Sequence, residues 1–206
     1  MNETRTLQED IRQPKGAAGV RAVIGSAPLR FAYADPPYFG CGKARYGHQH
    51  AEAAKWDDKQ THAELVNRLV TEYPDGWAMS CNSKDLRWLL PMCPEESRVG
   101  AWVKTWHQIR PTSTQWAWES VIWCGGRKDP KRNPMVRDWH KCNVALQRGV
   151  VGAKPESFCR WILDILCAEK HDTIDDLFPG SGAVTRSIDA WKTERTLWEQ
   201  NDQAER

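Results

Sequence analysis

The feature that most limits how this chain can fold is an apolar run at residues 29–34 that stops at Asp35-Pro36-Pro37-Tyr38. Proline cannot donate to a strand ladder, so two successive prolines exclude a continuing central strand. The run therefore predicts a buried β-strand that ends in a stiff turn. This turn places a carboxylate next to an aromatic ring, a combination that suits a flat group with an exocyclic amine. An ordinary proline turn with a surface tyrosine is the alternative.

Helix and strand patterns alternate along the rest of the chain. Helical spacing of apolar residues is expected after a capping box at Thr61-His62-Ala63-Glu64, and then at 85–90, 155–166 and 183–191. Apolar runs typical of strands lie at 77–81, 99–103, 116–124 and 174–178, and a short closing strand is expected at 196–198. The tryptophans of 116–124 are expected to pack on a sheet face. The alternation predicts an α/β fold with a mostly parallel sheet flanked by helices.

Length and composition narrow the class of protein. The 206 residues predict one main domain, 29–206, behind an N-terminal extension, 1–28. No apolar run is long enough for a membrane span, and the polar N-terminus is unlike a secretory signal. Seven cysteines without a CxxC pair indicate neither a disulfide framework nor a zinc site, so a reducing cytoplasm and no metal are expected.

Charge is distributed unevenly behind a net value of +2. Residues 124–150 contain seven Lys or Arg against two Asp, whereas residues 164–206 contain five Lys or Arg against ten Asp or Glu. Pro130 and Pro134 make the basic segment a loop. The split indicates a basic face for a polyanion, although charged loops are also commonly solvated surface.

A second specialised turn is Asp176-Leu177-Phe178-Pro179-Gly180-Ser181-Gly182, between a strand and a helix. Its glycines let a ligand approach the backbone, and the helix N-terminus adds partial positive charge. The sequence lacks both the full GxGxxG spacing and the P-loop GKS/GKT, so phosphate binding is poorly supported. Glu199 follows about 20 residues later, beyond a short strand, where an acid holds ribose hydroxyls in a nucleoside-binding βαβ unit.

Together the two turns resemble a known family. DPPY near the N-terminus and DxFxGSG near the C-terminus are similar to the permuted (β-type) S-adenosylmethionine-dependent DNA adenine-N6 methyltransferases, in which the catalytic motif comes first. Lys154-Pro155 before the glycine-rich strand and residues 118–123 (WESVIW) before the basic loop extend the resemblance from about residue 29 to 199. This chain departs from the family pattern at Leu177, where the family usually has proline. The resemblance implies a Rossmann-like methyltransferase fold with circularly permuted motif order.

The resemblance also implies roles for individual residues. The expected catalytic residues, which hold the adenine N6 amine and stack on its ring, are Asp35, Pro36, Pro37 and Tyr38. The expected residues for the cofactor S-adenosylmethionine are Asp176, Phe178, Gly180, Ser181, Gly182, Lys154, Pro155 and Glu199. The expected nucleic-acid contacts are Lys43, Arg45, Trp56, Arg127, Lys128, Lys131, Arg132 and Arg137. The basic loop at about 124–153 is expected to act as a minimal target-recognition element.

The implied reaction is methyl transfer to adenine N6 in DNA after base flipping. Methylation of cytosine N4, methylation of adenine in RNA, and a non-catalytic nucleic-acid-binding partner of an active methyltransferase remain alternatives. DPPY rather than SPPY favours adenine, and the RNA enzymes more often show DPPW. DNA is the expected partner, with no membrane, in the cytoplasm of a bacterium or a phage-infected cell; the sequence leaves open whether the protein forms a homodimer and whether it serves restriction-modification.

Overall fold

The computed structural model describes residues 27–48, 50–106, 109–128, 135–144 and 153–194. Its centre is a six-stranded sheet in the order β5-β3-β4-β2-β1-β6. The strands are β1 (Arg30–Ala34), β2 (Gly76–Cys81), β3 (Arg98–Lys104), β4 (Trp118–Gly125), β5 (Trp139–Cys142) and β6 (Thr173–Asp176). The helices are α1 (Lys59–Glu72), α2 (Leu86–Leu89), α3 (Glu156–Ile165) and α4 (Ala183–Thr193), with the short turns η1 (Gly42–Tyr46), η2 (Ala51–Asp57), η3 (Ser83–Asp85) and η4 (Leu90–Met92).

Strand direction decides where a site can form. β1 pairs in parallel with β2 and β6, and β3 pairs in parallel with β5. β4 is antiparallel to both of its neighbours, β2 and β3. The other five strands therefore all run the same way, which confirms the mostly parallel sheet. We call the edge where these five strands end the carboxyl edge, and the opposite edge the amino edge.

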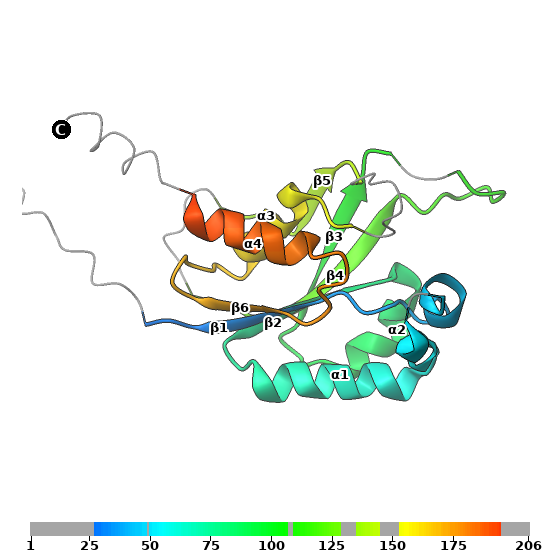
Figure 1. Cartoon of the computed structure of the whole chain (residues 1–206), viewed down its shortest axis with the longest axis horizontal. Coiled ribbons are helices and arrows are strands. Elements are labelled where there is room, and N and C mark those ends of the chain that lie inside the picture. Colours follow the sequence, from blue (N-terminus) through cyan, green and yellow to red (C-terminus); the bar gives the residue numbers. More distant parts are fainter. Residues whose placement is uncertain (1–26, 49, 107–108, 129–134, 145–152, 195–206) are drawn as a thin grey trace, which may run out of the picture.

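Helices cover both faces of the sheet (Figure 1): α1 lies on one face, and α3 and α4 lie on the other. The sheet has a hydrophobic core on each face, and alternate residues of β1 pack into one or the other. Phe31 and Tyr33 pack with α3 and α4, while Ala32 and Ala34 pack with α1. A strand buried on both faces is apolar throughout, which is why the buried residues 31–34 form a continuous apolar run.

Three details differ from the sequence prediction. The capping box at Thr61 is not the start of α1, because the carboxylate of Asp58 accepts a bond from the Thr61 amide (3.3 Å) and caps the helix earlier. The short helix expected at 85–90 is present as α2, but it is shorter, because Asp85 ends η3 and Leu90 begins η4. The basic segment contains β5, whose polar, partly exposed residues carry no apolar run because it pairs only with β3 among the strands described.

The expected strand at 196–198 and most of the extension 1–28 lie outside the described residues. No helix in the described ranges is long and apolar enough to cross a membrane.

Candidate active site

The turn after β1 delivers Asp35 to the carboxyl edge. Tyr33 and Ala34 are fully buried and fix the end of the strand, and the Asp35 side chain that follows is 22% exposed. Pro36 is buried, and Pro37 lines a cavity with Asp35. The stiff turn predicted from two prolines thus presents one carboxylate to a pocket.

The glycine-rich turn after β6 lies beside the first turn. β6 pairs with β1 so that Tyr33 stands opposite Asp176, and the Leu177 amide donates to the Tyr33 carbonyl (2.9 Å). Gly180 and Gly182 have φ values of +43° and +75°, a backbone region that side chains other than glycine rarely adopt. These glycines turn the chain from β6 into α4.

One cavity of about 700 Å³ lies between the two turns. Asp35 and Lys154 lie on one side of its lining, and Phe178, Gly180 and Ser181 contribute from the glycine-rich turn. Trp56 of η2 completes an aromatic wall, because its ring meets that of Phe178 edge to face at 5.0 Å between centroids. Sequence reasoning placed Trp56 among the nucleic-acid contacts, whereas the structure places it in the cavity with the expected cofactor residues.

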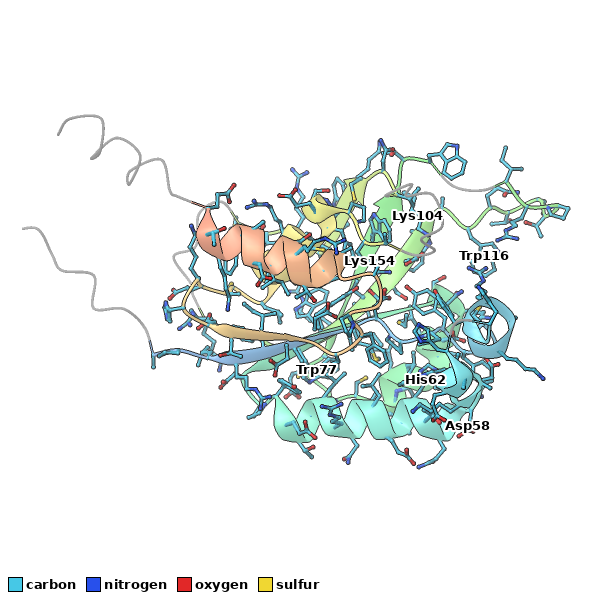
Figure 2. The ribbon with its side chains drawn as sticks, in the orientation of Figure 1. Asp58, His62, Trp77, Lys104, Trp116 and Lys154 are labelled. Carbon is cyan, nitrogen blue, oxygen red and sulfur yellow. The ribbon has the colours of Figure 1, made fainter. Side chains whose placement is uncertain are left out.

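A buried cluster of charges lies beside this cavity. The Lys154 ammonium is 3.1 Å from Asp35 Oδ1, 3.1 Å from Glu119 Oε2 and 3.3 Å from the Tyr38 hydroxyl. Tyr38 donates its hydroxyl to Glu119 Oε2 (2.7 Å), and Lys104 pairs with the other Glu119 oxygen. Figure 2 labels Lys154 and Lys104, the residue with which β3 ends at the carboxyl edge. Two carboxylates and two ammoniums therefore balance one another around the tyrosine.

Burial and pairing set the pKa values of this cluster. Burial raises the pKa of Asp35, and the ammonium of Lys154 opposes that rise. Burial also works against ionised Glu119, but Lys154 and Lys104 outweigh it and lower the Glu119 pKa to about 2. Burial disfavours charged Lys154, yet Asp35 and Glu119 outweigh it and raise the Lys154 pKa well above its usual value. Glu119 and Lys154 are therefore held in their ionised forms near neutral pH.

Sequence reasoning gave no role to Glu119 or Lys104. Glu119 lies within the WESVIW motif, but its partners come from β3, from the segment before α3 and from the turn after β1. The available signal was alternation along β4, which places Glu119 on the same face as the buried Val121 and Trp123. A carboxylate on a buried face needs cationic partners.

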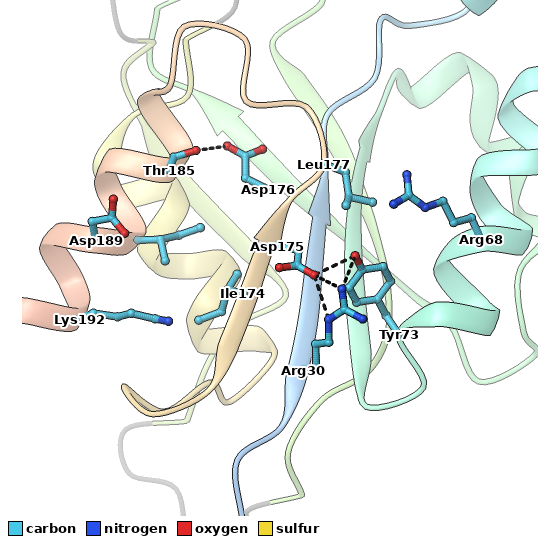
Figure 3. A pocket seen from close by; sticks show the side chains of 11 residues that line it. Arg30, Arg68, Tyr73, Ile174, Asp175, Asp176, Leu177, Thr185, Asp189 and Lys192 are labelled. Atoms are coloured by element: carbon cyan, nitrogen blue, oxygen red, sulfur yellow. Dashed lines mark hydrogen bonds and ion pairs between the residues drawn. The ribbon is translucent and has the colours of Figure 1, made fainter.

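Asp176 does not line the main cavity. Its carboxylate accepts bonds from the Phe178 amide (3.3 Å) and the Thr185 hydroxyl (2.8 Å), which braces the turn against α4. It lines a second cavity of about 450 Å³ along β6, together with Asp175, which is bonded to Arg30 and Tyr73 (Figure 3). Pro155 caps α3 and Gly182 caps α4, and neither lines the main cavity. Glu199 lies outside the described residues.

The expected nucleic-acid residues divide between the two edges of the sheet. Lys43 and Arg45 are exposed on η1, shortly after the turn Asp35-Pro36-Pro37-Tyr38. Arg127 follows the reversed strand β4 and therefore lies at the amino edge, where its guanidinium is 2.6 Å from the fully buried Asp172 carboxylate. Lys128 adjoins it and is exposed, and Arg137 lies over the Trp139 ring (5.3 Å) before β5 begins. Lys131 and Arg132 lie outside the described residues.

The structure therefore brings together Asp35, Lys154, Phe178, Gly180 and Ser181, drawn from distant parts of the sequence. A mostly parallel sheet that presents a glycine turn, an acid and an aromatic wall at its carboxyl edge is the arrangement in which open α/β folds bind ligands. The fold is a known one. The chain is similar in structure to the M1.HpyAVI–SAM complex, with a TM-score of 0.55 and 15% sequence identity over 80% of this chain and 79% of that chain.

This likeness confirms the Rossmann-like α/β fold expected from the sequence. At 15% identity it establishes the fold alone. No protein-family model matches the chain, and no curated protein matches it. The function must therefore be argued from the site.

Proposed function

We propose that this protein transfers a methyl group from S-adenosylmethionine to the N6 amine of adenine in DNA. The observation that carries the proposal is the single cavity shared by the DPPY turn and the glycine-rich turn. A methyl donor and an amine acceptor must meet at one place, and both turns contribute to the lining of this cavity. The resemblance of the two motifs to the adenine-N6 methyltransferases supplies the identity of the acceptor.

The cavity fits a nucleoside cofactor. Its volume of about 700 Å³ falls within the usual range for small-molecule sites. Trp56 and Phe178 offer an aromatic wall for a flat base, and Gly180 leaves the backbone open to a ligand, since a Cβ there would meet only the Phe178 carbonyl at 3.8 Å. The structurally similar M1.HpyAVI is a complex with SAM. When bound, S-adenosylmethionine supplies an electrophilic methyl group on a sulfonium.

Asp35 is the group that would hold the acceptor amine. The Lys154 ammonium pairs with Asp35 Oδ1. Asp35 Oδ2 has no partner among the residues the structure describes, so this oxygen can accept a hydrogen bond from the amine. The N6 lone pair is delocalised into the ring, and an acceptor array at Asp35 and the Pro36 carbonyl favours a pyramidal nitrogen. Aspartate, with a reference pKa of ~3.9, is too weak a base to remove the amine proton first. Asp35 therefore orients the amine and stabilises developing positive charge, and the proton leaves after transfer.

Tyr38 would stack on the flipped base. Its hydroxyl is held by Glu119 and Lys154, which fixes the direction of the ring. Extruding a base costs a few kcal/mol, and stacking on an aromatic ring returns roughly 1–3 kcal/mol. Glu119 acts through Tyr38 and Lys154, so we assign it a positioning role.

The test is to incubate the protein with labelled S-adenosylmethionine and DNA, digest the product to nucleosides and identify the methylated base. N6-methyladenine is expected. Asp35→Ala should abolish transfer while binding of S-adenosylmethionine by calorimetry persists. N4-methylcytosine, label in RNA but not in DNA, or undiminished turnover by Asp35→Ala would each overturn the proposal.

A further inference from the structure

The loop between β3 and β4 is a projecting arm, described at residues 105–106 and 109–117, which leaves the sheet at the carboxyl edge (Figure 1). Seven large apolar side chains are exposed in the described part of the chain. Four of them lie on the arm or at its root: Trp106 (54% exposed), Ile109 (83%), Trp116 (53%) and Trp118 (41%). An apolar cluster of this kind commonly marks a binding surface.

Hydrogen bonds give the arm a defined shape. Gln115 closes the tip, because its side-chain oxygen accepts from the Arg110 amide (2.8 Å) and its side-chain nitrogen donates to the Arg110 carbonyl (3.0 Å). At the root, the Lys104 amide donates to the Ala117 carbonyl (2.8 Å). The tip bonds tie the Arg110 backbone to Gln115, the residue that precedes the exposed Trp116.

The charge of the arm indicates the chemistry of its partner. Residues 105–117 contain Arg110 and no aspartate or glutamate, and Lys104 at the root is already paired with Glu119. Exposed aromatic rings beside cations are the combination by which proteins bind nucleic-acid strands, since the rings stack on bases and the cations meet phosphates. A second copy of this chain is a poorer fit, because a symmetric contact would bring two cationic arms together.

The arm is rooted in the charge cluster of the candidate active site. Lys104 precedes the arm and Glu119 follows it, and these two residues pair with each other. Glu119 pairs with Lys154, which pairs with Asp35 at 3.1 Å. Figure 2 shows Lys104, Lys154 and Trp116 toward the same end of the sheet. A strand held on the arm would therefore lie next to the pocket that receives the target base.

We propose that the arm binds the DNA strand carrying the target adenine and stacks Trp106 and Trp116 on unpaired bases beside it. The identity of the partner as DNA rests on the proposed function; the stacking geometry rests on the arm itself. This assigns strand binding to a β3–β4 arm at the carboxyl edge, in addition to the basic loop 124–153 expected from the sequence.

The experiment measures DNA affinity separately from turnover. Fluorescence anisotropy gives the Kd of the full chain for a labelled single-stranded DNA, and 2-aminopurine beside the target adenine reports stacking. Trp106→Ala and Trp116→Ala should each raise the Kd about tenfold and restore 2-aminopurine fluorescence. Trp106→Phe with Trp116→Phe, which keep aromatic rings, should restore most of the affinity. Val70→Ala is the control, because Val70 is an apolar residue 37% exposed on α1, outside both the arm and the basic loop 124–153.

The proposal is overturned if the double alanine variant binds DNA like the unmodified protein, or if Val70→Ala weakens binding equally. Binding of an RNA strand without binding of DNA overturns the assignment to DNA. Sedimentation velocity showing that the double variant turns a dimer into a monomer, with unchanged affinity per chain, assigns the arm to a second copy instead. Arm-dependent DNA binding without methyl transfer would refute the proposed function and leave the arm assignment standing.

Discussion

Glu119→Gln is the substitution that tests the charge cluster most directly. The Glu119 side chain is 20% exposed and faces Lys104, Lys154 and the Tyr38 hydroxyl. Glutamine keeps the shape but removes the charge, so two ammoniums lose a shared partner. Breaking a buried ion pair from one side typically costs about 3–5 kcal/mol. The shift of the Glu119 pKa from 4.5 to about 2 gives an independent figure of about 3 kcal/mol.

The pH dependence has a definite sign. The folded-state pKa of Glu119 lies below its unfolded value, so its ionised form stabilises the fold. This contribution is fully present above pH 4.5 and is lost as the pH falls toward 2. Urea unfolding of the unmodified protein and of Glu119→Gln should therefore differ by about 3 kcal/mol near neutral pH, with a gap that narrows below pH 4.5.

Glu72→Gln is the matched control, because Glu72 pairs with Arg68 on the surface of α1 and is 48% exposed. An exposed pair of this kind is worth under about 0.5 kcal/mol, so the control should unfold almost as the unmodified protein does. A Glu119→Gln loss below about 1 kcal/mol, or a gap that stays constant down to pH 2.5, would refute the cluster as a stabilising unit.

Three further outcomes are expected. Arg127→Met should lower the free energy of unfolding in urea by about 3 kcal/mol, because the buried Asp172 carboxylate loses the Arg127 guanidinium. DNA affinity should stay unchanged, and weaker DNA binding would argue against the amino-edge placement of Arg127. Lys43→Gln with Arg45→Gln should reduce the slope of log Kd for DNA against log salt by about 2, and an unchanged slope would remove η1 from the interface. Trp56→Ala should weaken calorimetric binding of S-adenosylmethionine about tenfold through loss of the ring packed on Phe178, and equal binding would exclude Trp56 from the cofactor wall.

Local patterns were sufficient to predict most elements and both turns. The apolar run before Asp35 and the helical stripe after Pro155 are visible in the sequence because each depends on burial of its own residues. The glycine-rich turn is visible because positive φ at Gly180 and Gly182 requires that residue type. Burial patterns and turn glycines depend only on a short stretch of chain, so they can be recognised from the local sequence.

Long-range partners could not be predicted in the same way. Glu119 meets Lys154 only because the segment before α3 returns to the carboxyl edge, and Arg127 meets Asp172 only because β4 is reversed. The apolar pattern of a strand is the same whether the strand runs parallel or antiparallel to its neighbours. The sequence pattern therefore does not tell at which edge of the sheet the loop after the strand begins. For this reason the sequence could not indicate that Arg127 and Lys128, two of the expected nucleic-acid contacts, follow a strand that ends at the amino edge.

The tryptophans show the same limit. Residues 116–124 predict indoles packed on a sheet face, and Trp123 is indeed buried at 5% exposure. Trp118 and Trp116 are exposed, because β4 begins at Trp118, and Trp116 already belongs to the arm. The tryptophans of this segment therefore serve two purposes, since Trp123 fills the core and Trp116 lies on the surface that we assign to DNA.

The reversal of β4 also explains the uneven charge of the sequence. Because β4 ends at the amino edge, the basic segment starts beside the acidic one, and Arg127 pairs there with Asp172 and with Glu169. Part of the basic excess is thus neutralised within the fold and is not available to a polyanion. β5 then carries the chain back, and Lys141 is exposed toward the carboxyl edge, opposite Val103. Among the residues that the structure describes, the cations placed to act on DNA under the proposed function come from this returning part, from η1 and from the arm.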